Sequence, residues 1–408
     1  MATSNTVIAV GRDVTEYRPL TEDHVDEFRE ITSDAFAPER GPGVPDPDDS
    51  AEIGERRGVF EGETLVAVCR QYYLPTRVRG EWLNAGLLAA VATPPEYRRR
   101  GHARTLLDGT LREYRSRDIP ISLLWPFDHG FYARYGWGRT NEYATVELPV
   151  GTLPSGSDRD RGRILRIDSD EGRRLESAYH AHADGYDLSL DRTSDWWTRQ
   201  VLTSGGKDCY TYAYERDGEL HGYVVYRIES TGDALDDRIL RARELAWTDR
   251  AAYRRLLAFL HDHDAQVNRV ELRLPLNAPM FDLVGDPAAV EYRVVPGPMA
   301  RIVDVVKALT GTPVPGEGGR LTLRVEDPLA EWNDRTFTLD ATRERIACKP
   351  TDASPAATVR IGTLSRLYVG SMSADDAIGC GDLDAEDDAT AILDGVFPER
   401  SVFLREFF

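Results

Sequence analysis

Apolar positions in the first part of the chain follow a strand period, then a helix period, then strands again. Residues 17–36 begin as a short strand and continue as a helix, with Thr21 as the expected N-cap and His24 where a full capping box has a glutamate. From residue 56, RRGVFEGETLVAVCRQYYLPTRVRG and EWLNAGLLAAVAT are rich in valine, leucine and aromatic residues. They predict antiparallel strands that lead to a buried strand. The intervening residues 38–55, rich in proline, glycine and acidic side chains, are expected to form a mobile surface loop.

The next segment, PPEYRRRGHARTLLDGTLREYRSRD, keeps one apolar stripe at helical spacing and predicts a helix that begins just after Gly101. Residues 119–125, IPISLLW, are too short and too apolar for a surface helix and predict a buried strand. Residues 83–125 should therefore form a strand, helix and strand with a right-handed crossover. Residues 128–148 add a helical turn and a closing hairpin.

The middle of the chain repeats this plan faintly. Residues 240–276 again predict a strand, a helix and a strand, but the turn before the helix lacks a glycine. Residues 151–162 have the composition of a linker, and a second boundary falls near PGPMAR. We therefore expect three domains, 1–150, 151–296 and 297–408, of which the first two are α/β and the third is a small α+β domain.

The composition limits the environment and the partners of the protein. The 408 residues include 69 acidic and 50 basic side chains, for a net charge of −19, which argues against general binding to nucleic acid. Only Lys207, Lys307 and Lys349 are lysines, and this scarcity beside many aspartates is typical of a halophile. No apolar run of about 18 residues and no signal-peptide pattern is visible, so a cytoplasmic protein without a membrane partner is expected.

Other chemistry is weakly indicated. The four cysteines lie far apart with no CxxC pair, so neither a metal cage nor a disulfide framework is expected. The pairs His180/His182 and His261/His263 are spaced i, i+2, which places the two members on different sides of a helix. We therefore expect no metal site.

The sharpest local feature is VATPPEYRRRGHA, residues 91–103, which lies between a buried strand and a helix. A helix N-terminus presents unpaired N–H groups and a partial positive charge, and a glycine lets a phosphate approach the backbone. Pro94 and Pro95 end the strand ladder and leave its edge open to an extended ligand. The alternative is that RRRG is a solvated run of charge. Neither GxxxxGK[ST] nor a GxGxxG after a strand is present.

These residues resemble the GNAT acetyltransferases, in which the pyrophosphate of acetyl-CoA lies on an R/Q-x-x-G-x-G/A turn. More narrowly, NAGLLAAVATPPEYRRRGHARTLL and GFYARYGWG resemble the enhanced-intracellular-survival (Eis-like) acetyltransferases. The resemblance implies an N-terminal GNAT domain that binds acetyl-CoA, a degenerate GNAT-like domain and a sterol-carrier-like domain that ends at a catalytic C-terminus. It also implies direct acetyl transfer to an amine, and a homo-oligomer, as large as a hexamer.

The resemblance also assigns residues. The cofactor-binding positions it implies are Val91, Ala92, Thr93, Arg98, Arg99, Arg100, Gly101, His102, Ala103, Arg104, Phe127 and Asp128. The family's tyrosine acid corresponds to Tyr132 of YARYGWG, and its terminal carboxylate to that of Phe408. Within this run Ala133 stands where the family has glycine, Tyr135 where it has phenylalanine and Trp137 where it has tyrosine.

Elementary chemistry favours this pair of groups. A carboxylate attracts a protonated amine and accepts its proton, while a phenol protonated at neutral pH stabilises the departing thiolate. The expected acceptor is a polyamine, an aminoglycoside-like molecule or a lysine side chain. Two alternatives stay open: a CoA- or lipid-binding carrier without turnover, and an enzyme whose acceptor is a macromolecule.

Overall fold

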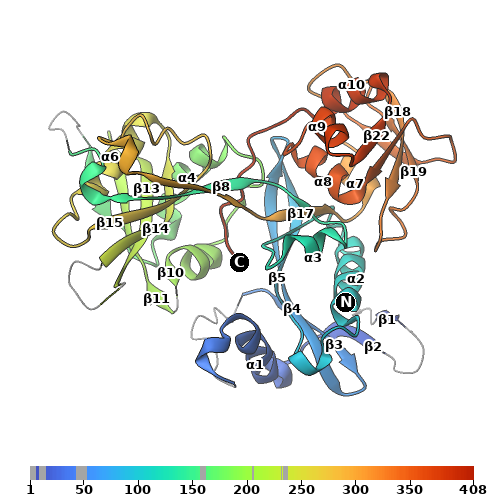
Figure 1. Ribbon diagram of the computed structural model, residues 1–408, viewed down its shortest axis with the longest axis horizontal. Helices are drawn as coiled ribbons and strands as arrows, with labels where there is room; N and C mark the ends of the chain where they lie inside the picture. The colour runs from blue at the N-terminus through green and yellow to red at the C-terminus, as the bar shows by residue number, and fades with distance from the viewer. Residues whose placement is uncertain are drawn as a thin grey trace. The chain divides into compact units, whose positions relative to one another are not determined.

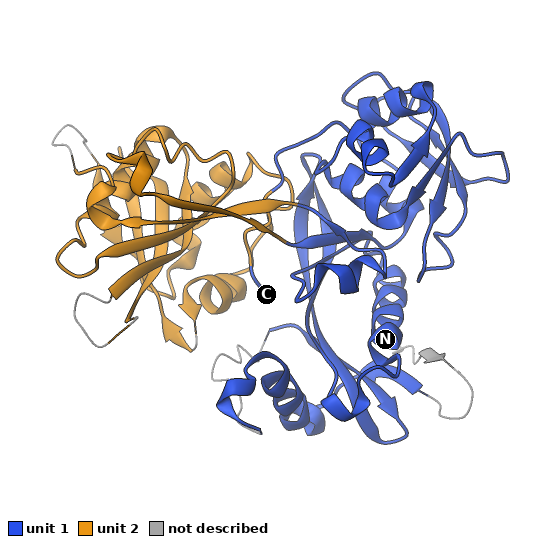
Figure 2. Ribbon diagram, viewed as in Figure 1, with its two compact units in different colours: residues 1–140, 298–402, 407–408 blue, residues 141–297, 403–406 orange. Residues whose placement is uncertain are grey.

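The computed structural model describes residues 6–8, 15–42, 53–156, 162–204, 206–230, 232 and 238–408. The chain forms two compact units, drawn in blue and orange in Figure 2. Unit 1 contains residues 1–140, 298–402 and 407–408, and unit 2 contains residues 141–297 and 403–406. The predicted loop at 38–55 and the predicted linker at 151–162 fall partly outside the described residues.

The first sheet of unit 1 has eight strands in the order β1-β2-β3-β4-β5-β6-β17-β7 (Figure 1). Their bounds are β1 Thr6–Ile8, β2 Thr15–Pro19, β3 Glu55–Glu61, β4 Thr64–Val78, β5 Glu81–Ala92, β6 Ile121–Leu124, β7 Gly138–Arg139 and β17 Met299–Ile302. Strands β2 to β5 pair antiparallel, and β5 pairs parallel with β6. The predicted strand, helix and strand of residues 83–125 are thereby confirmed.

Helices cover this sheet as the apolar periods predict. Helix α1 is Val25–Phe36, α2 is His102–Ser116 and α3 is His129–Ala133. The apolar stripe of α2 is fully buried, and Gly86 of β5 allows the close approach. A Cβ atom at Gly86 would lie 2.5 Å from the ring of Tyr114. Before α1, the Thr21 N–H donates to His24 Nδ1 at 3.3 Å, so the histidine completes the capping box in place of glutamate.

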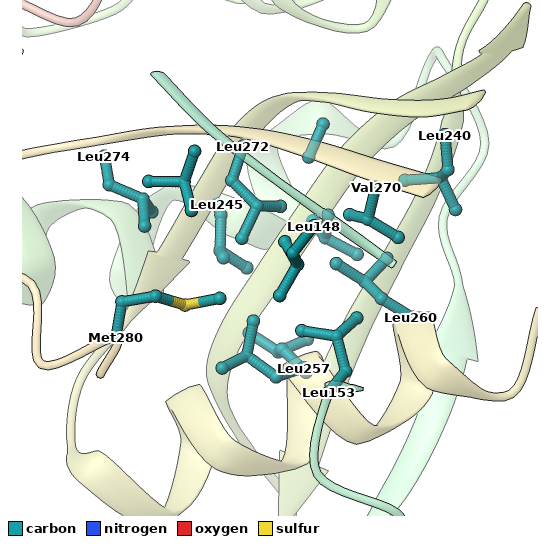
Figure 3. Packing of buried hydrophobic residues seen from close by; sticks show 14 of the residues in the cluster. Leu148, Leu153, Leu240, Leu245, Leu257, Leu260, Val270, Leu272, Leu274 and Met280 are labelled. Atoms are coloured by element: carbon teal, nitrogen blue, oxygen red, sulfur yellow. The ribbon is translucent and has the colours of Figure 1, made fainter. Parts of the chain in front are cut away.

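Unit 2 holds a seven-stranded sheet in the order β16-β8-β15-β14-β13-β12-β9. The strands are β8 Glu142–Pro149, β9 Arg163–Arg166, β12 Tyr210–Arg216, β13 Glu219–Ser230, β14 Arg238–Trp247, β15 Arg269–Leu274 and β16 Glu291–Pro296. Helix α6, Arg250–His261, connects the parallel pair β14 and β15, as predicted. Leucines from these elements fill the core beneath the sheet (Figure 3). The smaller elements are α4 Glu176–Ala183, α5 Ser194–Trp196, β10 Thr203–Ser204 and β11 Lys207–Asp208.

Two strands lie outside the sheets that their sequence positions suggest. Strand β8, predicted to close the first domain, pairs with β15 and β16 in unit 2. Strand β17, predicted to open the third domain, pairs with β6 and β7 in unit 1. The change from unit 1 to unit 2 falls near residue 140, ten residues before the predicted boundary at 150. The change back falls at residue 298, next to the predicted boundary at 297, but the residues that follow it belong to unit 1. The physical reason is that strand pairing depends on partners far apart in sequence, which a local pattern does not specify.

The last part of unit 1 is the predicted α+β fold. Its five-stranded sheet has the order β20-β19-β18-β21-β22. The strands are β18 Arg320–Glu326, β19 Thr336–Asp340, β20 Ala347–Pro350, β21 Ala357–Arg360 and β22 Leu383–Ala385, and the helices are α7 Val305–Leu309, α8 Ile361–Val369, α9 Ala374–Gly379 and α10 Asp387–Val396. Among the described residues no helix combines the length and the apolar character needed to span a bilayer.

Candidate active site

Strands β5 and β6 separate at one end of the first sheet. Their parallel pairing ends at Leu88 and Leu124, whereas β5 continues to Ala92 and stays paired on its other side with β4. A register shift in β4 and a positive φ of 50° at Ala90 mark a bulge at this point. No described strand pairs with the edge of residues 89–92 that faces away from β4. The predicted contacts at Val91, Ala92 and Thr93 lie on this open edge.

The turn that follows has two residues with positive φ and an open front. Arg99 has φ of 63° and Gly101 has φ of 92°, and alternation of this kind turns successive N–H groups toward one point. No side chain caps the N-terminus of α2. A Cβ atom at Gly101 would meet no heavy atom within 4 Å, so the turn is open in front of the glycine, and Ala103 adds only a methyl group in the first helical turn.

The four arginines of the turn are all exposed, but they differ in what they contact. Arg98 Nε donates to the Thr93 carbonyl at 3.0 Å and ties the turn to the end of the strand. Arg100 lies over a tyrosine ring, and Arg104 donates to a main-chain carbonyl at 3.3 Å. Arg99 has no hydrogen bond or ion pair with any described residue. Its guanidinium is the most available cation at the turn.

His102 differs from the role that the resemblance implies for it. Its side chain is 3% exposed, and Nε2 lies 3.4 Å from Glu61 Oε1. The imidazole therefore faces the interior of unit 1. Only its main-chain N–H, at the start of α2, is placed to meet a phosphate.

Helix α6 of unit 2 occupies the position equivalent to α2 but begins differently. Its N-cap is Asp249, whose side chain accepts a hydrogen bond from Ala252 N at 2.8 Å. This carboxylate already satisfies an N–H group and places negative charge where a phosphate would lie. The glycine missing from the sequence thus corresponds to a helix start that repels anions.

Tyr132 lies in the last turn of α3 and is 2% exposed. Its ring contacts those of Phe127 at 5.5 Å and Trp137 at 6.1 Å between centroids. Burial raises the pKa of Tyr132 above its ordinary value, and nearby Cys69 raises it further. Burial also raises the pKa of the Cys69 thiol to about 12. Both groups are therefore protonated at neutral pH.

Phe127 and Asp128, the two residues before α3, make different contacts. Asp128 is the N-cap of the helix, and its carboxylate accepts from Phe131 N at 3.0 Å. Phe127 is 64% exposed and lies against the Tyr132 ring. Asp128 therefore orients the short helix that carries Tyr132, while Phe127 offers an apolar surface beside it.

The C-terminal residues return to the first sheet. The Phe408 ring lies 6.3 Å from that of Tyr72 in β4, and the Phe407 ring lies 5.4 Å from that of Trp125, just after β6. Phe407, Phe408 and both of these partners belong to unit 1. No sequence pattern pointed to Tyr72 or Trp125, because an aromatic residue in a strand usually indicates only a packed core.

The rings of Tyr132 and Phe408 pack on opposite faces of this sheet. The neighbours of Tyr72 face α2, since Gln71 Nε2 donates to Thr110 Oγ1 at 3.3 Å and the Tyr73 ring lies 5.8 Å from that of Tyr114. Side chains alternate along a strand, so Tyr72 and the Phe408 ring lie on the other face. Tyr132 packs into the cluster that contains the buried stripe of α2.

The last feature of the site concerns the side chains that could bind a metal ion. Among the described residues, no three histidine, cysteine, aspartate or glutamate side chains come together as a metal ion would need.

Three domain families match the chain. Residues 16–140 and residues 188–302 each match the acetyltransferase (GNAT) domain, and residues 305–405 match the sterol carrier protein domain. Among curated proteins, an uncharacterized N-acetyltransferase of Streptomyces avermitilis is 24% identical over 327 residues, which are 78% of this chain and 80% of that protein.

Solved structures show the same fold. A GCN5-related N-acetyltransferase from Anabaena variabilis superposes with a TM-score of 0.84 at 22% identity, over 97% of this chain and all of that one. Eis1 from Mycobacterium abscessus superposes with a TM-score of 0.76 at 23% identity, with the same coverage.

These matches account for the order of the three folds. The chain belongs to the GNAT N-acetyltransferases and has the Eis-like arrangement of two acetyltransferase domains followed by a sterol-carrier-like domain.

Proposed function

We propose that this acetyltransferase moves the acetyl group of acetyl-CoA directly to a primary amine of a cationic acceptor, with Tyr132 as general acid and the Phe408 carboxylate as general base. The observation that carries the proposal is the place of the chain's last residue. Phe408 lies against Tyr72 in β4, the strand that pairs with β5 beside the open edge. A frayed terminus would have no such contact.

Coenzyme A is proposed to bind along this edge and turn. The pantetheine arm would pair with the backbone of residues 91–93, and the pyrophosphate would lie at the N–H groups of Gly101 to Ala103 with Arg99 beside it. Phe127 would cover the thiol end of the arm. The carboxylate of Asp249 caps the N-terminus of α6 and would repel a phosphate there, which supports the proposal that only the first GNAT domain holds the cofactor.

The proton balance of the reaction suits the two groups. The protonated amine first loses one proton to the Phe408 carboxylate, which passes it to water. The neutral amine then forms a bond to the acetyl carbon and gives a second proton to the carboxylate, while the carbon–sulfur bond breaks and the thiolate takes the Tyr132 proton. Because burial raises the pKa of Tyr132, the phenol holds its proton until a thiolate forms. The phenolate then recovers a proton from water or from the new carboxylic acid.

The acceptor class follows from charge. A protein with a net charge of −19 and a carboxylate as base attracts a cationic amine such as a polyamine, an aminoglycoside-like molecule or an exposed lysine. The alternative, a carrier of CoA or lipid without turnover, would not require Tyr132 or a fixed C-terminus. A cytoplasmic location is part of the proposal on the composition alone, and a homo-oligomer is part of it on the resemblance alone.

The test pairs two changes. Tyr132→Phe and a one-residue extension after Phe408 should each lower kcat by about 10²-fold, while the Kd for coenzyme A measured by calorimetry changes less than about two-fold. Tyr135→Phe, from the same YARYGWG run, is the matched control. Full activity in both test variants would reject the roles of Tyr132 and the terminal carboxylate. Absence of turnover with every amine offered to the native enzyme would favour a carrier.

A further inference from the structure

Each of residues 403–405, just before the C-terminus, donates a hydrogen bond to another residue of unit 2. Phe403 N donates to the Asp187 carbonyl at 3.0 Å, and Leu404 N donates to a side-chain amide oxygen at 3.2 Å. Arg405 Nη1 donates to the Leu245 carbonyl at 2.7 Å. Main-chain and side-chain hydrogen bonds together hold residues 403–405 in place, so this end of the chain is ordered.

Glu406 ends this series in a buried ion cluster. Arg192 Nε donates to Glu406 Oε1 at 2.8 Å, and its Nη1 and Nη2 atoms donate to the two oxygens of Glu244 at 2.8 and 2.9 Å. The side chains of all three residues are at most 7% exposed. The guanidinium also lies 3.8 Å from the centroid of the Tyr179 ring and 4.5 Å from that of Trp197. Separating Glu406 from this cluster would leave the buried Arg192 charge with one carboxylate fewer, which costs free energy. Glu406 is therefore held firmly in place.

The position of Glu406 limits where the terminal carboxylate can lie. Two residues, at about 3.8 Å between successive Cα atoms, separate Glu406 from the end of the chain, so the carboxylate stays within about 10 Å of the Glu406 Cα atom. If residues 403–406 were released, a tail of six residues would search a radius of about 20 Å. A base that explores such a volume loses most of its effective concentration at the reacting amine.

We propose that Glu406 and Arg192 are positioning residues for the terminal carboxylate: the buried pair fixes the chain two residues before its end and so aims the base. This inference rests on the proposed role of the Phe408 carboxylate. Neither residue is a catalytic residue, since both act through the position of the carboxylate.

The cluster supplies a matched pair of variants. Glu406→Gln and Glu244→Gln each remove one of the two carboxylates that face Arg192, and each leaves the guanidinium with one anionic partner. Only Glu406 lies in the tail. If the cluster served folding alone, the two variants would behave alike.

The first readout is independent of catalysis. Carboxypeptidase A removes aromatic C-terminal residues, so the full-length protein is treated with it and the loss of Phe408 is followed by intact-protein mass spectrometry. Loss of one charge-assisted hydrogen bond should raise the release rate of Glu406→Gln about tenfold or more over the native protein. Glu244→Gln should stay within about three-fold of the native rate. Equal rates for the native protein and Glu406→Gln, or for the two variants, would overturn the proposal.

The second readout is the split between kinetic constants. Glu406→Gln should lower kcat about tenfold or more and leave KM for acetyl-CoA within about two-fold, with no such fall in Glu244→Gln. A released tail with unchanged kcat would show that Glu406 anchors the terminus but that the carboxylate is not the base. Should Glu406→Gln not fold, Arg405→Gln applies the same two measurements to the neighbouring anchor, and native protection of Phe408 in that variant would overturn the proposal.

Discussion

Single residues in this protein acquire chemistry from burial and backbone angle more than from their type. Tyr132 and Cys69 are both protonated because burial raises the pKa of each group. Gly101 is required for a different reason: its φ of 92° is costly for a residue with a Cβ atom, although the space around it is open.

Gly101→Ala should therefore weaken coenzyme A binding without creating a clash. The left-handed conformation costs alanine about 1 kcal/mol, and relief of that strain moves the N–H groups of the turn. We expect the Kd for coenzyme A to rise about tenfold in calorimetry. Gly62→Ala is the matched control, because Gly62 also has a positive φ and open space but lies in the β3–β4 turn. Equal effects of the two variants on Kd would contradict the assignment of the turn.

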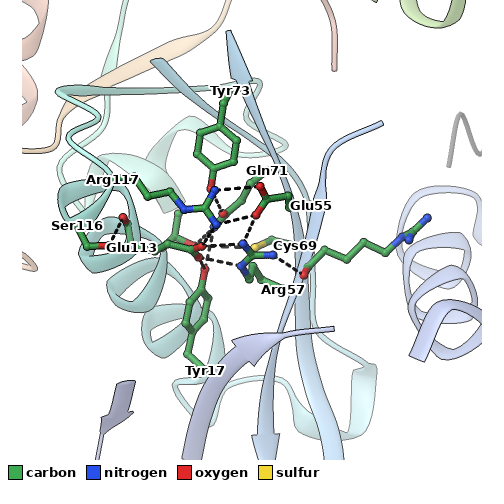
Figure 4. Close-up of polar contacts among 11 residues, drawn as sticks. Tyr17, Glu55, Arg57, Cys69, Gln71, Tyr73, Glu113, Ser116 and Arg117 are labelled. Carbon is green, nitrogen blue, oxygen red and sulfur yellow. Dashed lines mark hydrogen bonds and ion pairs between the residues drawn. The ribbon is translucent and has the colours of Figure 1, made fainter. Parts of the chain in front are cut away.

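At the scale of elements, helix α2 is tied to the sheet through one carboxylate. Glu113 of α2 accepts from Arg57 of β3 at 2.7 and 2.8 Å, from the Tyr17 hydroxyl of β2 at 2.7 Å and from Arg117 at 2.7 Å (Figure 4). Burial by itself would raise the pKa of Glu113, but the bonds from Arg57 and Tyr17 lower it below its ordinary value. The helix that begins at the phosphate turn is thus held at its other end by charge.

This network predicts how stability depends on pH. A carboxylate whose pKa is lowered by folding stabilises the protein above its unfolded pKa of about 4.3, and that stabilisation is lost as the pH falls through the folded pKa. Glu113→Gln should lower the unfolding free energy at pH 7 by about 2 kcal/mol or more and flatten its decline below about pH 5. Glu81→Gln, which breaks an exposed pair with Arg345, should cost about 0 to 1 kcal/mol. Denaturant unfolding at several pH values measures both, and a Glu113 variant with native stability would refute the role of the network.

At the scale of the whole molecule, the excess of negative charge lowers the stability of the folded state. With 69 acidic and 50 basic residues, repulsion among carboxylates destabilises the folded state and is screened by salt. We expect Tm at neutral pH to rise by several degrees between about 0.05 and 1 M KCl. The same series near the isoelectric point is the control, since the effect of salt should largely vanish there. A Tm that falls with KCl at neutral pH would contradict the expectation of a halophilic protein.

Sequence patterns predicted the elements of the first sheet well, because the spacing of apolar residues and the positions of glycine and proline are local properties of the chain. The helix after Gly101, the buried strands on either side of it and the later strand, helix and strand of unit 2 are all confirmed. The predicted boundaries placed residues 142–149 in the first domain and residues 299–302 in the third, whereas β8 pairs with strands of unit 2 and β17 with strands of the first sheet. Pairing is decided by hydrogen bonds to strands more than a hundred residues away, which leave no local trace.

Local patterns were enough to predict the three folds and the family, and they led to the proposal of an anion-binding turn, because each depends on residues close together in the chain. Local patterns did not predict that the His102 ring faces the interior, that Asp128 caps a helix or that Phe408 lies against Tyr72, all of which are tertiary contacts or depend on the folded backbone. The tertiary structure also brought Arg192, Glu244 and Glu406 into one buried cluster. The physical reason is that contacts across long separations arise from packing of the whole chain, and neither spacing nor composition encodes which distant side chains meet.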